Sequence, residues 1–184
     1  MDQVQESANL IWMDLEMTGL NPEKEGILEM AVIVTDSDLN ILAEGPVLYI
    51  SQPESLLQAM DDWNTTHHTQ SGLIERVKSE GISDQEAEER MLEFLKNHTR
   101  AGESPLCGNT IGQDRRFLVR YQPRLDAWLN YRSIDVSSIK ELAKRWRPEL
   151  MSCFSKKEAH RALDDIRESI EELRFYREHF FRAG

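Results

Sequence analysis

The stretch Leu10-Ile11-Trp12-Met13-Asp14-Leu15-Glu16 decides how the fold of this chain is interpreted. It is apolar apart from two acids, and Thr18-Gly19 interrupts it, which is typical of a buried β-strand that ends in a turn. Alternate residues of a strand project to the same side, so Asp14 and Glu16 should point together. Paired carboxylates in an apolar strand are costly unless cations neutralise them, and Mg²⁺ binds such oxygen ligands. The pair therefore predicts a metal site, unless the strand ends here and the acids reach water.

The segments after this strand favour further strands. Residues 27–35 hold a run of apolar side chains, and residues 41–50 are another strand candidate after the polar turn at residues 36–40. Three consecutive strands joined by short polar turns predict an antiparallel meander. Later in the chain, residues 106–108 are typical of the end of a buried strand and residues 133–136 of a short strand.

Helical spacing and capping residues predict helices in the remainder of the chain. Ser83 begins a capping-box pattern, and Ser137 or Ser138 is the expected cap of a later helix. Alternation of strands and helices predicts an α/β fold: a mixed sheet of three antiparallel strands and then strand–helix alternation, flanked by helices. We expect a single domain over residues 1–184 with a polar tail at residues 1–8. The expected helices are 55–62 and 72–79, with the stretch 63–72 between them, then 84–98, a segment around 117–121, 137–146 and 158–181.

Length and composition agree with a globular domain that has its own core. The chain has 184 residues, of which 40% are hydrophobic and 30% charged. Its two cysteines, Cys107 and Cys153, form no CxxC pair and no disulfide framework, so we expect a reducing compartment. The N-terminus lacks the basic and apolar regions of a signal peptide, and no stretch has the ~18 apolar residues of a membrane span. The expected location is the cytoplasm, without a membrane partner.

The charge of the chain is unevenly distributed. The net charge is −11, but the segment from Arg115 to Arg147 holds nine Lys/Arg and three acids and therefore carries +6, which leaves −17 for the rest. Affinity for phosphate backbones comes from Lys and Arg. This balance predicts a short phosphate-bearing ligand and not a long duplex, while the alternative interpretation of the basic residues is a solvated helix face.

Three further positions are candidates for the same site. Asp114 follows a polar loop with two glycines that leads into a helix, where a carboxylate on its own is more typical of a cap. In the last helix, at ~100° per residue, Asp164 falls opposite the apolar face, whereas Asp165 lies at its flank and can lean over the sheet. Asp165 is therefore the candidate ligand. His160 lies about one turn earlier, and on its own it would be interpreted as a surface residue.

Taken together, these positions resemble one family of enzymes. Asp14-x-Glu16, Asp114 and His160-x4-Asp165 follow the pattern of the DEDDh exonucleases, a branch of the ribonuclease H-like fold. Longer motifs make the chain similar to the oligoribonuclease family from about residue 10 to residue 181. These motifs are MDLEMTGL at 13–20, MDDWN at 60–64, GNTIGQDRRF at 108–117 and ALDDIRES at 162–169.

The resemblance implies a hydrolase that uses two divalent metal ions, Mg²⁺ or Mn²⁺. It implies 3′-to-5′ cleavage of very short RNA, down to dinucleotides, with nucleoside 5′-monophosphates as products. Asp14, Glu16, Asp114 and Asp165 would hold the metals. His160 would take the proton from the attacking water, as suits a group with an unperturbed pKa near ~6.5.

The resemblance also implies a set of substrate-binding residues and a homodimer. Leu20 and Trp63 would pack against the bases, and His68 would contact the substrate. The family closes around the terminal phosphate with residues that match Thr110, Tyr131, Arg132, Ser137 and Ser138, and Tyr131 and Arg132 would come from the partner subunit. Two positions depart from the family: Thr110 stands where serine is expected, and His67 where a residue other than histidine is expected.

Two alternative functions remain open from the sequence. One is a DEDDh exonuclease that trims longer single-stranded 3′ ends of DNA or RNA, against which the acidic balance and the expectation of a single domain argue. The other is a non-catalytic nucleotide-binding protein on the same fold. That reading would be natural if one of the five key residues were missing, and all five are present.

Overall fold

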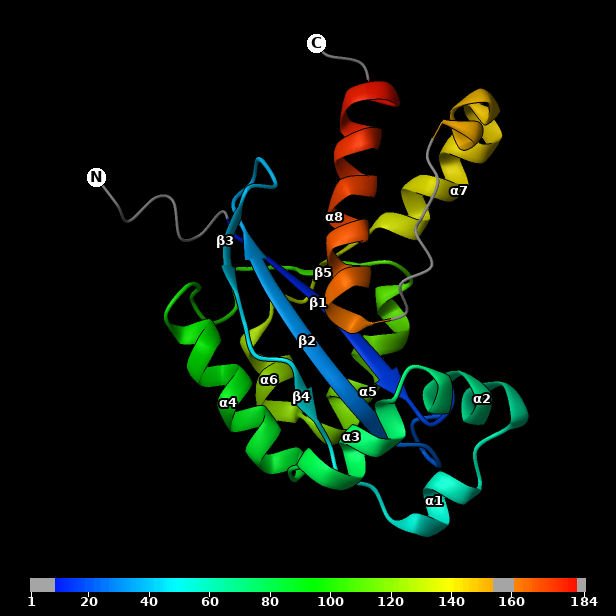
Figure 1. Cartoon of the computed structure of the whole chain (residues 1–184). Helices are drawn as coiled ribbons and strands as arrows, with labels where there is room; N and C mark the ends of the chain where they lie inside the picture. Colours follow the sequence, from blue (N-terminus) through cyan, green and yellow to red (C-terminus); the bar gives the residue numbers. More distant parts are fainter. Residues whose placement is uncertain (1–8, 154–160, 182–184) are drawn as a thin grey trace.

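A six-stranded mixed sheet forms the centre of the fold (Figure 1). The structure is a computed structural model that describes residues 9–153 and 161–181. The strand order is β3-β2-β1-β5-β6, and β4 pairs with β2 beyond the end of β3. The strands are β1 (Leu10–Met17), β2 (Ile27–Thr35), β3 (Ile41–Glu44), β4 (Leu48–Tyr49), β5 (Leu106–Gly108) and β6 (Ser133–Asp135).

The central strand β1 pairs on both of its edges. It runs antiparallel to β2, with Asp14 opposite Ala31 and Glu16 opposite Glu29, and parallel to β5 on the other side. The strand β6 continues the sheet parallel to β5. The predicted sheet, an antiparallel meander followed by strands that alternate with helices, is confirmed.

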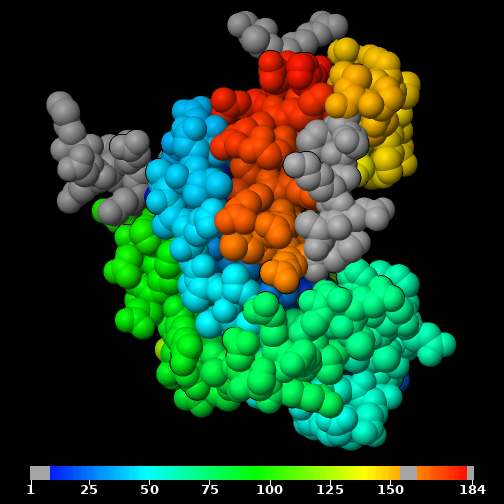
Figure 2. All heavy atoms as spheres, in the orientation of Figure 1, coloured from blue at the N-terminus to red at the C-terminus, as the bar shows by residue number. Residues whose placement is uncertain are grey.

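Helices cover both faces of this sheet. In Figure 1, α8 and α7 lie on one side of the strands, and α4, α5 and α6 lie on the other. The space-filling view shows α8 over the middle of the sheet, so that β1 is almost hidden (Figure 2). The helices are α1 (Glu54–Gln58), α2 (Asp62–Gln70), α3 (Leu73–Glu80), α4 (Asp84–Lys96), α5 (Ile111–Tyr121), α6 (Pro123–Trp128), α7 (Val136–Trp146), the short 3₁₀ helix η2 (Pro148–Ser152) and α8 (Ala162–His179).

The side-chain alternation of β1 assigns each of its residues to one helical layer. Ile11, Met13 and Leu15 are buried in the cluster that includes residues of α4, α5 and α6. Trp12 is buried in the second cluster, with residues of α7 and α8. Because alternate residues share a face, Asp14 and Glu16 lie on the Trp12 side, toward α8. The strand therefore presents its two carboxylates to the helix that carries Asp165.

The third predicted strand, residues 41–50, is interrupted in the structure. β3 ends at Glu44, and β4 begins at Leu48. The Gly45 N–H still bonds to the Val32 carbonyl oxygen, at 2.9 Å, and a Cβ at Gly45 would overlap the side chains of Val32 and Phe94. The chain passes too close to the sheet here for a larger residue. The prediction of one continuous strand is wrong because of this close approach.

The helix predictions differ from the structure at residues 62–70 and at the cap of α7, and the short helices α6 and η2 were not predicted. Residues 62–70, left between two expected helices, form α2, whose N-cap Asp61 accepts a hydrogen bond from the Asn64 N–H at 2.7 Å. The cap of α7 is Asp135, which accepts from the Ser137 N–H at 2.9 Å, so the prediction of Ser137 or Ser138 as the cap is wrong. The capping of α4 by Ser83 is confirmed.

The described helices include no candidate for a membrane span. Within residues 9–153 and 161–181, the helices lack the combination of length and apolar character that crossing a bilayer requires.

Candidate metal centre and its surroundings

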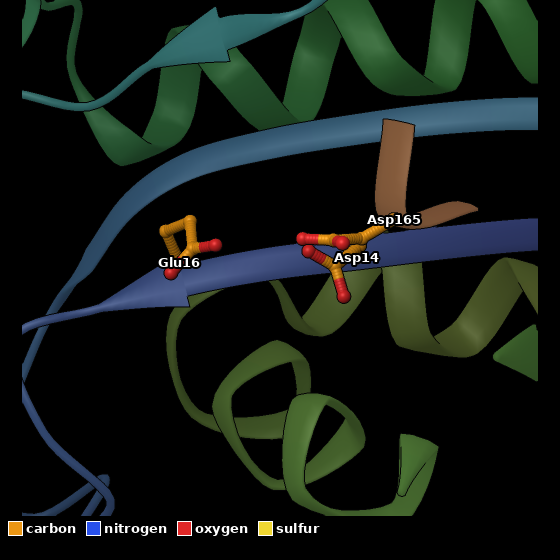
Figure 3. Close-up of side chains that lie close together, drawn as sticks. All are labelled: Asp14, Glu16 and Asp165. Atoms are coloured by element: carbon orange, nitrogen blue, oxygen red, sulfur yellow. The ribbon is translucent and has the colours of Figure 1, made fainter. Parts of the chain in front are cut away.

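Three carboxylates from two distant segments meet between β1 and α8. Asp14 and Glu16 project from β1, and Asp165 projects from the first turn of α8 (Figure 3). One oxygen of each carboxylate lies within 4.8 Å of those of the other two. Asp164, the neighbouring acid, is 43% exposed and pairs with Arg167 at 3.0 Å. The prediction that Asp165, and not Asp164, leans toward the sheet from the last helix is therefore confirmed.

Asp114 adds a fourth carboxylate from the opposite helical layer. It lies in the first turn of α5 and is 7% exposed. One of its oxygens accepts the backbone N–H of Leu15 at 3.0 Å, and Leu15 stands between Asp14 and Glu16. The N-cap of α5 is Thr110, so the interpretation of Asp114 as a cap, based on its local sequence alone, is wrong. Its side chain is bonded to the central strand instead.

Burial and mutual repulsion raise the pKa values of these acids. The pKa of Asp14 is raised well above its usual value, first by burial and then by the charges of Asp114, Glu16 and Asp165. Burial and nearby carboxylates raise the pKa of Glu16 to about 8, and burial raises that of Asp114 to about 7. Clustered oxygen ligands whose ionised forms repel one another fit a hard divalent cation, which relieves that repulsion.

The structure adds a carboxylate that the sequence analysis missed. Glu29 of β2 lies directly across from Glu16 and is 7% exposed. Its charge is the first neighbouring charge that raises the pKa of Glu16. Burial raises the pKa of Glu29 itself, and the charges of Arg161 and Arg76 only partly oppose that rise. The local signal, an acid inside an apolar strand, was the same as for Asp14, but the position of Glu29 opposite Glu16 depends on the register of β2 against β1.

His68 anchors α2 against the end of β1. It is 1% exposed, and its Nε2 bonds to the carbonyl oxygen of Met17 at 2.9 Å, so Nε2 carries the proton. Its Nδ1 lies 4.0 Å from a carboxylate oxygen of Glu16. Burial lowers the pKa of His68, which favours the neutral ring. The structure thus places this predicted substrate-binding residue beside the carboxylates.

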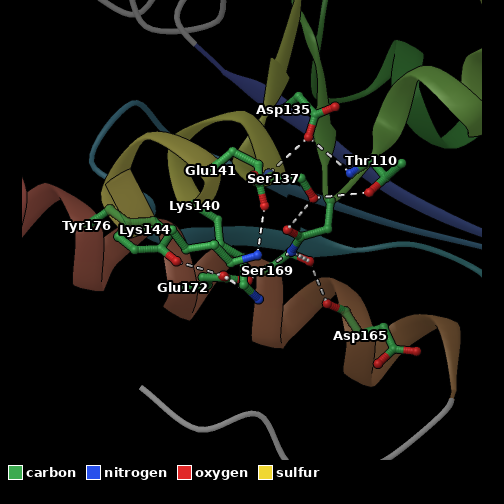
Figure 4. A network of polar contacts seen from close by, with 11 residues as sticks. Thr110, Asp135, Ser137, Lys140, Glu141, Lys144, Asp165, Ser169, Glu172 and Tyr176 are labelled. Atoms are coloured by element: carbon green, nitrogen blue, oxygen red, sulfur yellow. Dashed lines mark hydrogen bonds and ion pairs between the residues drawn. The ribbon is translucent and has the colours of Figure 1, made fainter. Parts of the chain in front are cut away.

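Thr110 and Ser137, two residues predicted at the phosphate end, are brought together. Their hydroxyl oxygens are 3.1 Å apart (Figure 4). A carboxylate oxygen of Asp135 accepts the backbone N–H of both residues, at 3.0 Å and 2.9 Å. Thr110 has φ 55°, in the left-handed region, so Asp135 stabilises an unfavourable backbone conformation. The pair is held in place by residues that the sequence analysis did not single out.

The Asn109 side chain connects this pair to α8. Its Oδ1 accepts from the Ser137 hydroxyl at 3.0 Å, and its Nδ2 donates to the Ser169 hydroxyl at 2.8 Å and to Glu172 at 3.1 Å. The Ser169 hydroxyl in turn donates to the backbone carbonyl of Asp165 at 2.9 Å (Figure 4). The Thr110–Ser137 pair, predicted at the phosphate end, and the backbone of Asp165 therefore share one hydrogen-bonded network.

A buried ion pair closes the network. Glu172 is fully buried, and its carboxylate lies 3.4 Å from the Lys140 ammonium and accepts from the Tyr176 hydroxyl at 3.0 Å. A buried carboxylate is stabilised only when it is paired and hydrogen-bonded, and here both conditions hold. These residues lie far from Asn109 in sequence, and no local signal indicated them.

The remaining predicted substrate-binding residues are at the surface. Leu20, Trp63 and Tyr131 are 73%, 67% and 74% exposed. The Arg132 guanidinium lies 4.4 Å from the centre of the Tyr131 ring. Ser138 is also exposed. In the described part of the chain, Tyr131, Arg132 and Ser138 make no side-chain hydrogen bond to the Thr110–Ser137 pair. His160 lies outside the described residues.

Comparison with known sequences gives matches along almost the whole chain. The RNase T family model of exonucleases matches residues 11–173. The oligoribonuclease of Marinobacter nauticus is 62% identical over 173 residues, which cover 94% of this chain and 96% of the relative. The oligoribonuclease of Escherichia coli K12 is 58% identical over 174 residues, with 95% and 96% covered.

Comparison with solved structures gives the same fold. Exonuclease I of Methylocaldum szegediense has a TM-score of 0.72 at 22% identity, with 94% of this chain covered and 41% of that one. Escherichia coli exonuclease I in complex with a dA16 oligonucleotide has a TM-score of 0.70 at 17% identity, with 92% and 41% covered. This chain therefore spans about two fifths of those structures, and it shares their ribonuclease H-like fold.

Proposed function

Because this chain belongs to the oligoribonuclease family of 3′-to-5′ exoribonucleases, we propose that its substrates are very short RNAs, down to dinucleotides. Water attacks phosphorus, the bond from phosphorus to the 3′ oxygen of the preceding nucleotide breaks, and a nucleoside 5′-monophosphate leaves. The observation that carries the proposal is the meeting of Asp14, Glu16 and Asp165 within 4.8 Å, with Asp114 bonded to the same strand. Residues 1–184 act as one exonuclease domain.

The four carboxylates would hold two divalent cations, Mg²⁺ or Mn²⁺. Asp14, Glu16, Asp114 and Asp165 offer only oxygen ligands, which such cations prefer. When two ions are bound, they stabilise the attacking and leaving oxygens of an in-line displacement. The protein contributes the fixed positions: β1 aligns two ligands, and the Leu15 N–H orients Asp114.

His160 is the general base in this proposal. It takes the proton from the attacking water, a role that suits an imidazole, whose reference pKa is ~6.5. The assignment rests on the family resemblance, in which His160 precedes Asp165 by five positions. The variant His160→Ala is expected to lose turnover while it retains binding of Mn²⁺ and of a dinucleotide. Unchanged turnover would remove His160 from the mechanism.

The substrate lies across a surface with an open and a closed end. Leu20 and Trp63, both exposed, pack against the bases, and His68 contacts the substrate beside the carboxylates. Thr110, Ser137 and Ser138 bind the terminal phosphate, which lies at the 5′ end because cleavage proceeds from the 3′ end. A closed phosphate end limits the length of substrate that fits, and this supports the preference for dinucleotides.

A homodimer completes the phosphate end. Tyr131 and Arg132 of the partner subunit supply an aromatic ring and a guanidinium, and the latter matches a phosphate through two parallel hydrogen bonds. Tyr131 is exposed, and the Arg132 guanidinium lies over its ring, which supports the proposal that both side chains extend toward a partner subunit.

The cytoplasm is the proposed compartment, in keeping with two free cysteines, Cys107 and Cys153.

Dinucleotide hydrolysis tests the proposal. Turnover of a 5′-phosphorylated RNA dinucleotide is compared with that of a longer single-stranded RNA and a longer single-stranded DNA, with Mg²⁺, Mn²⁺ or EDTA. Hydrolysis should need the metal and should fall by more than about 100-fold in Asp165→Ala, because outer partners of metal ligands alone account for about 10–100-fold. The matched control is Asp164→Ala, which removes an exposed neighbour. Preference for the longer DNA, or full turnover in EDTA, would overturn the proposal.

A further inference from the structure

His67 is the sequence feature that the proposed function leaves unused. The family resemblance places a residue other than histidine at this position, directly before the buried His68. In the structure, the His67 ring stacks on the Trp63 indole, with centroids 4.8 Å apart and planes at 9°. Trp63 and His67 are one helical turn apart on α2, a spacing at which side chains meet. The imidazole therefore covers part of the indole, and Trp63 is still 67% exposed.

The stack is connected to the metal centre through a third ring. The His67 ring meets the His68 ring edge to face, with centroids 5.7 Å apart and planes at 69°. His68 is buried and bonded to the Met17 carbonyl oxygen. The His68 ring, held at the end of β1, can thus limit the motion of the His67 ring, and the His67 ring can limit the motion of the exposed Trp63 indole. Without the middle ring, Trp63 would have no stacked neighbour at that turn of α2.

We propose that His67 is a positioning residue that holds the Trp63 indole ready for a nucleobase. The inference rests on the proposed base contact of Trp63 and deepens it. An exposed tryptophan loses side-chain freedom when a base stacks on it, which weakens binding. Stacking on His67 removes much of that freedom before the substrate arrives. One face of the indole packs on the imidazole, and the exposed remainder receives the base.

The magnitude follows from the cost of ordering a side chain on binding. That cost is about 0.5–1.5 kcal/mol, and prior stacking on His67 removes it, which corresponds to about two- to tenfold in an equilibrium constant. Because the stack acts on binding and lies outside the carboxylate cluster, it should change KM and leave kcat nearly constant. A purely structural role of His67 in α2 would lower stability without separating KM from kcat.

The experiment measures KM and kcat for an RNA dinucleotide in three variants of α2. His67→Ala should raise KM by about two- to tenfold at constant kcat, since the stack is lost. His67→Phe keeps a stacking ring and should restore KM to within about twofold. Thr66→Ala, on the adjacent residue that lines the same hollow as Trp63 and His67, is the matched control and should behave as the parent protein. Thermal denaturation checks that each variant is folded.

A second measurement follows the indole directly. The ¹⁵N relaxation of the Trp63 indole N–H, assigned with Trp63→Phe, should show faster internal motion in His67→Ala than in the parent protein or in His67→Phe. Unchanged indole motion, unchanged KM in His67→Ala, or failure of His67→Phe to restore KM would each overturn the positioning role.

The variant Trp63→Ala separates this inference from the function on which it rests. If Trp63→Ala raises KM and His67→Ala adds no further increase in that background, both the base contact and the positioning role are supported. If Trp63→Ala raises KM but His67→Ala in the parent protein leaves it unchanged, only the positioning role fails. If Trp63→Ala itself leaves KM unchanged, the base contact of the proposed function fails, and the positioning role fails with it.

Discussion

Asp114 accepts the backbone N–H of Leu15, the residue that separates Asp14 from Glu16, at 3.0 Å. The two residues are 99 positions apart in the chain. One oxygen of Asp114 thus satisfies a buried donor of the central strand and at the same time fixes the carboxylate beside the other acids. The side chain therefore has a structural role and a proposed metal-binding role that substitution can separate.

Replacement of Asp114 should divide these two roles. Asp114→Asn keeps an oxygen that can accept the Leu15 N–H but removes the charge, whereas Asp114→Ala leaves that buried N–H without a partner. An unsatisfied buried donor costs about 1–3 kcal/mol, so the asparagine variant should be the more stable of the two by about that amount. Both variants should lose hydrolysis. Urea denaturation in EDTA measures the difference, and equal stabilities would show that the hydrogen bond contributes little.

The metal-free protein should lose stability as the pH rises. The pKa of Glu16 is raised to about 8 and that of Asp114 to about 7, while unfolded carboxyls titrate near about 4. The folded state therefore binds these protons more tightly than the unfolded state. Their contribution to stability is fully present below about pH 4 and is lost as the pH rises toward 8. Thermal denaturation at several pH values in EDTA measures this loss.

The matching control adds Mg²⁺ or Mn²⁺. A bound cation favours the ionised carboxylates, so the increase in melting temperature caused by the metal should grow between pH 5 and pH 8. Calorimetry of metal binding near pH 6.5, in buffers of different ionisation enthalpy, should show release of protons. A pH-independent stabilisation by metal would contradict the protonated cluster.

The buried pair of Lys140 and Glu172 offers a test of the network around Asn109. Lys140→Met leaves the Glu172 carboxylate buried without its cation. Breaking a fully buried pair costs about 3–5 kcal/mol, and because Lys140 is 35% exposed we expect about 1–2 kcal/mol. Addition of Glu172→Gln to Lys140→Met should recover part of that loss, since no charge then remains unpaired. Urea denaturation of the two single variants and the double variant gives the coupling free energy between Lys140 and Glu172. Strictly additive losses of stability would argue against an interaction between the two side chains.

The proposed trans contribution of Arg132 predicts complementation between two inactive variants. Asp165→Ala lacks a proposed metal ligand but presents an intact Arg132, and Arg132→Ala has the reverse defect. If Arg132 acts in the partner's site, a mixed dimer contains one complete site, so mixing should restore turnover of a 5′-phosphorylated dinucleotide. The control is each variant mixed with itself. If mixed samples gain nothing although they exchange subunits, Arg132 acts within its own chain or not at all.

The sheet and the acids of β1 could be predicted because both follow from short periodicities. The two-residue repeat of a strand places Asp14 and Glu16 on one side, and the 100° step of a helix distinguishes Asp165 from Asp164. Both results depend only on neighbouring residues. In the structure, β1 and α8 present these acids to one another.

The features that escaped prediction depend on distant contacts or on polar segments. α2 has no apolar stripe, and its one buried residue is His68, so its only local signal was the cap Asp61. Glu29 acquires its importance from the register of β2 against β1, which a sequence does not reveal. Asn109 and Glu172 are separated by 63 positions, and no local pattern joins them. Local periodicity places Asp14, Glu16 and Asp165 correctly, whereas tertiary contacts decide the position of Asp114 and of the residues around the cluster.

The amide of Asn109 has a consequence for redesign of this enzyme. Through Ser137 it contacts the proposed phosphate end, and through Ser169 it holds the backbone of Asp165. If both proposed roles hold, substrate length and ligand placement are not independent traits at this position, and a replacement chosen to admit longer RNA should also disturb catalysis. A designer who wants a wider length range should leave this amide intact and begin with the exposed Tyr131 and Arg132.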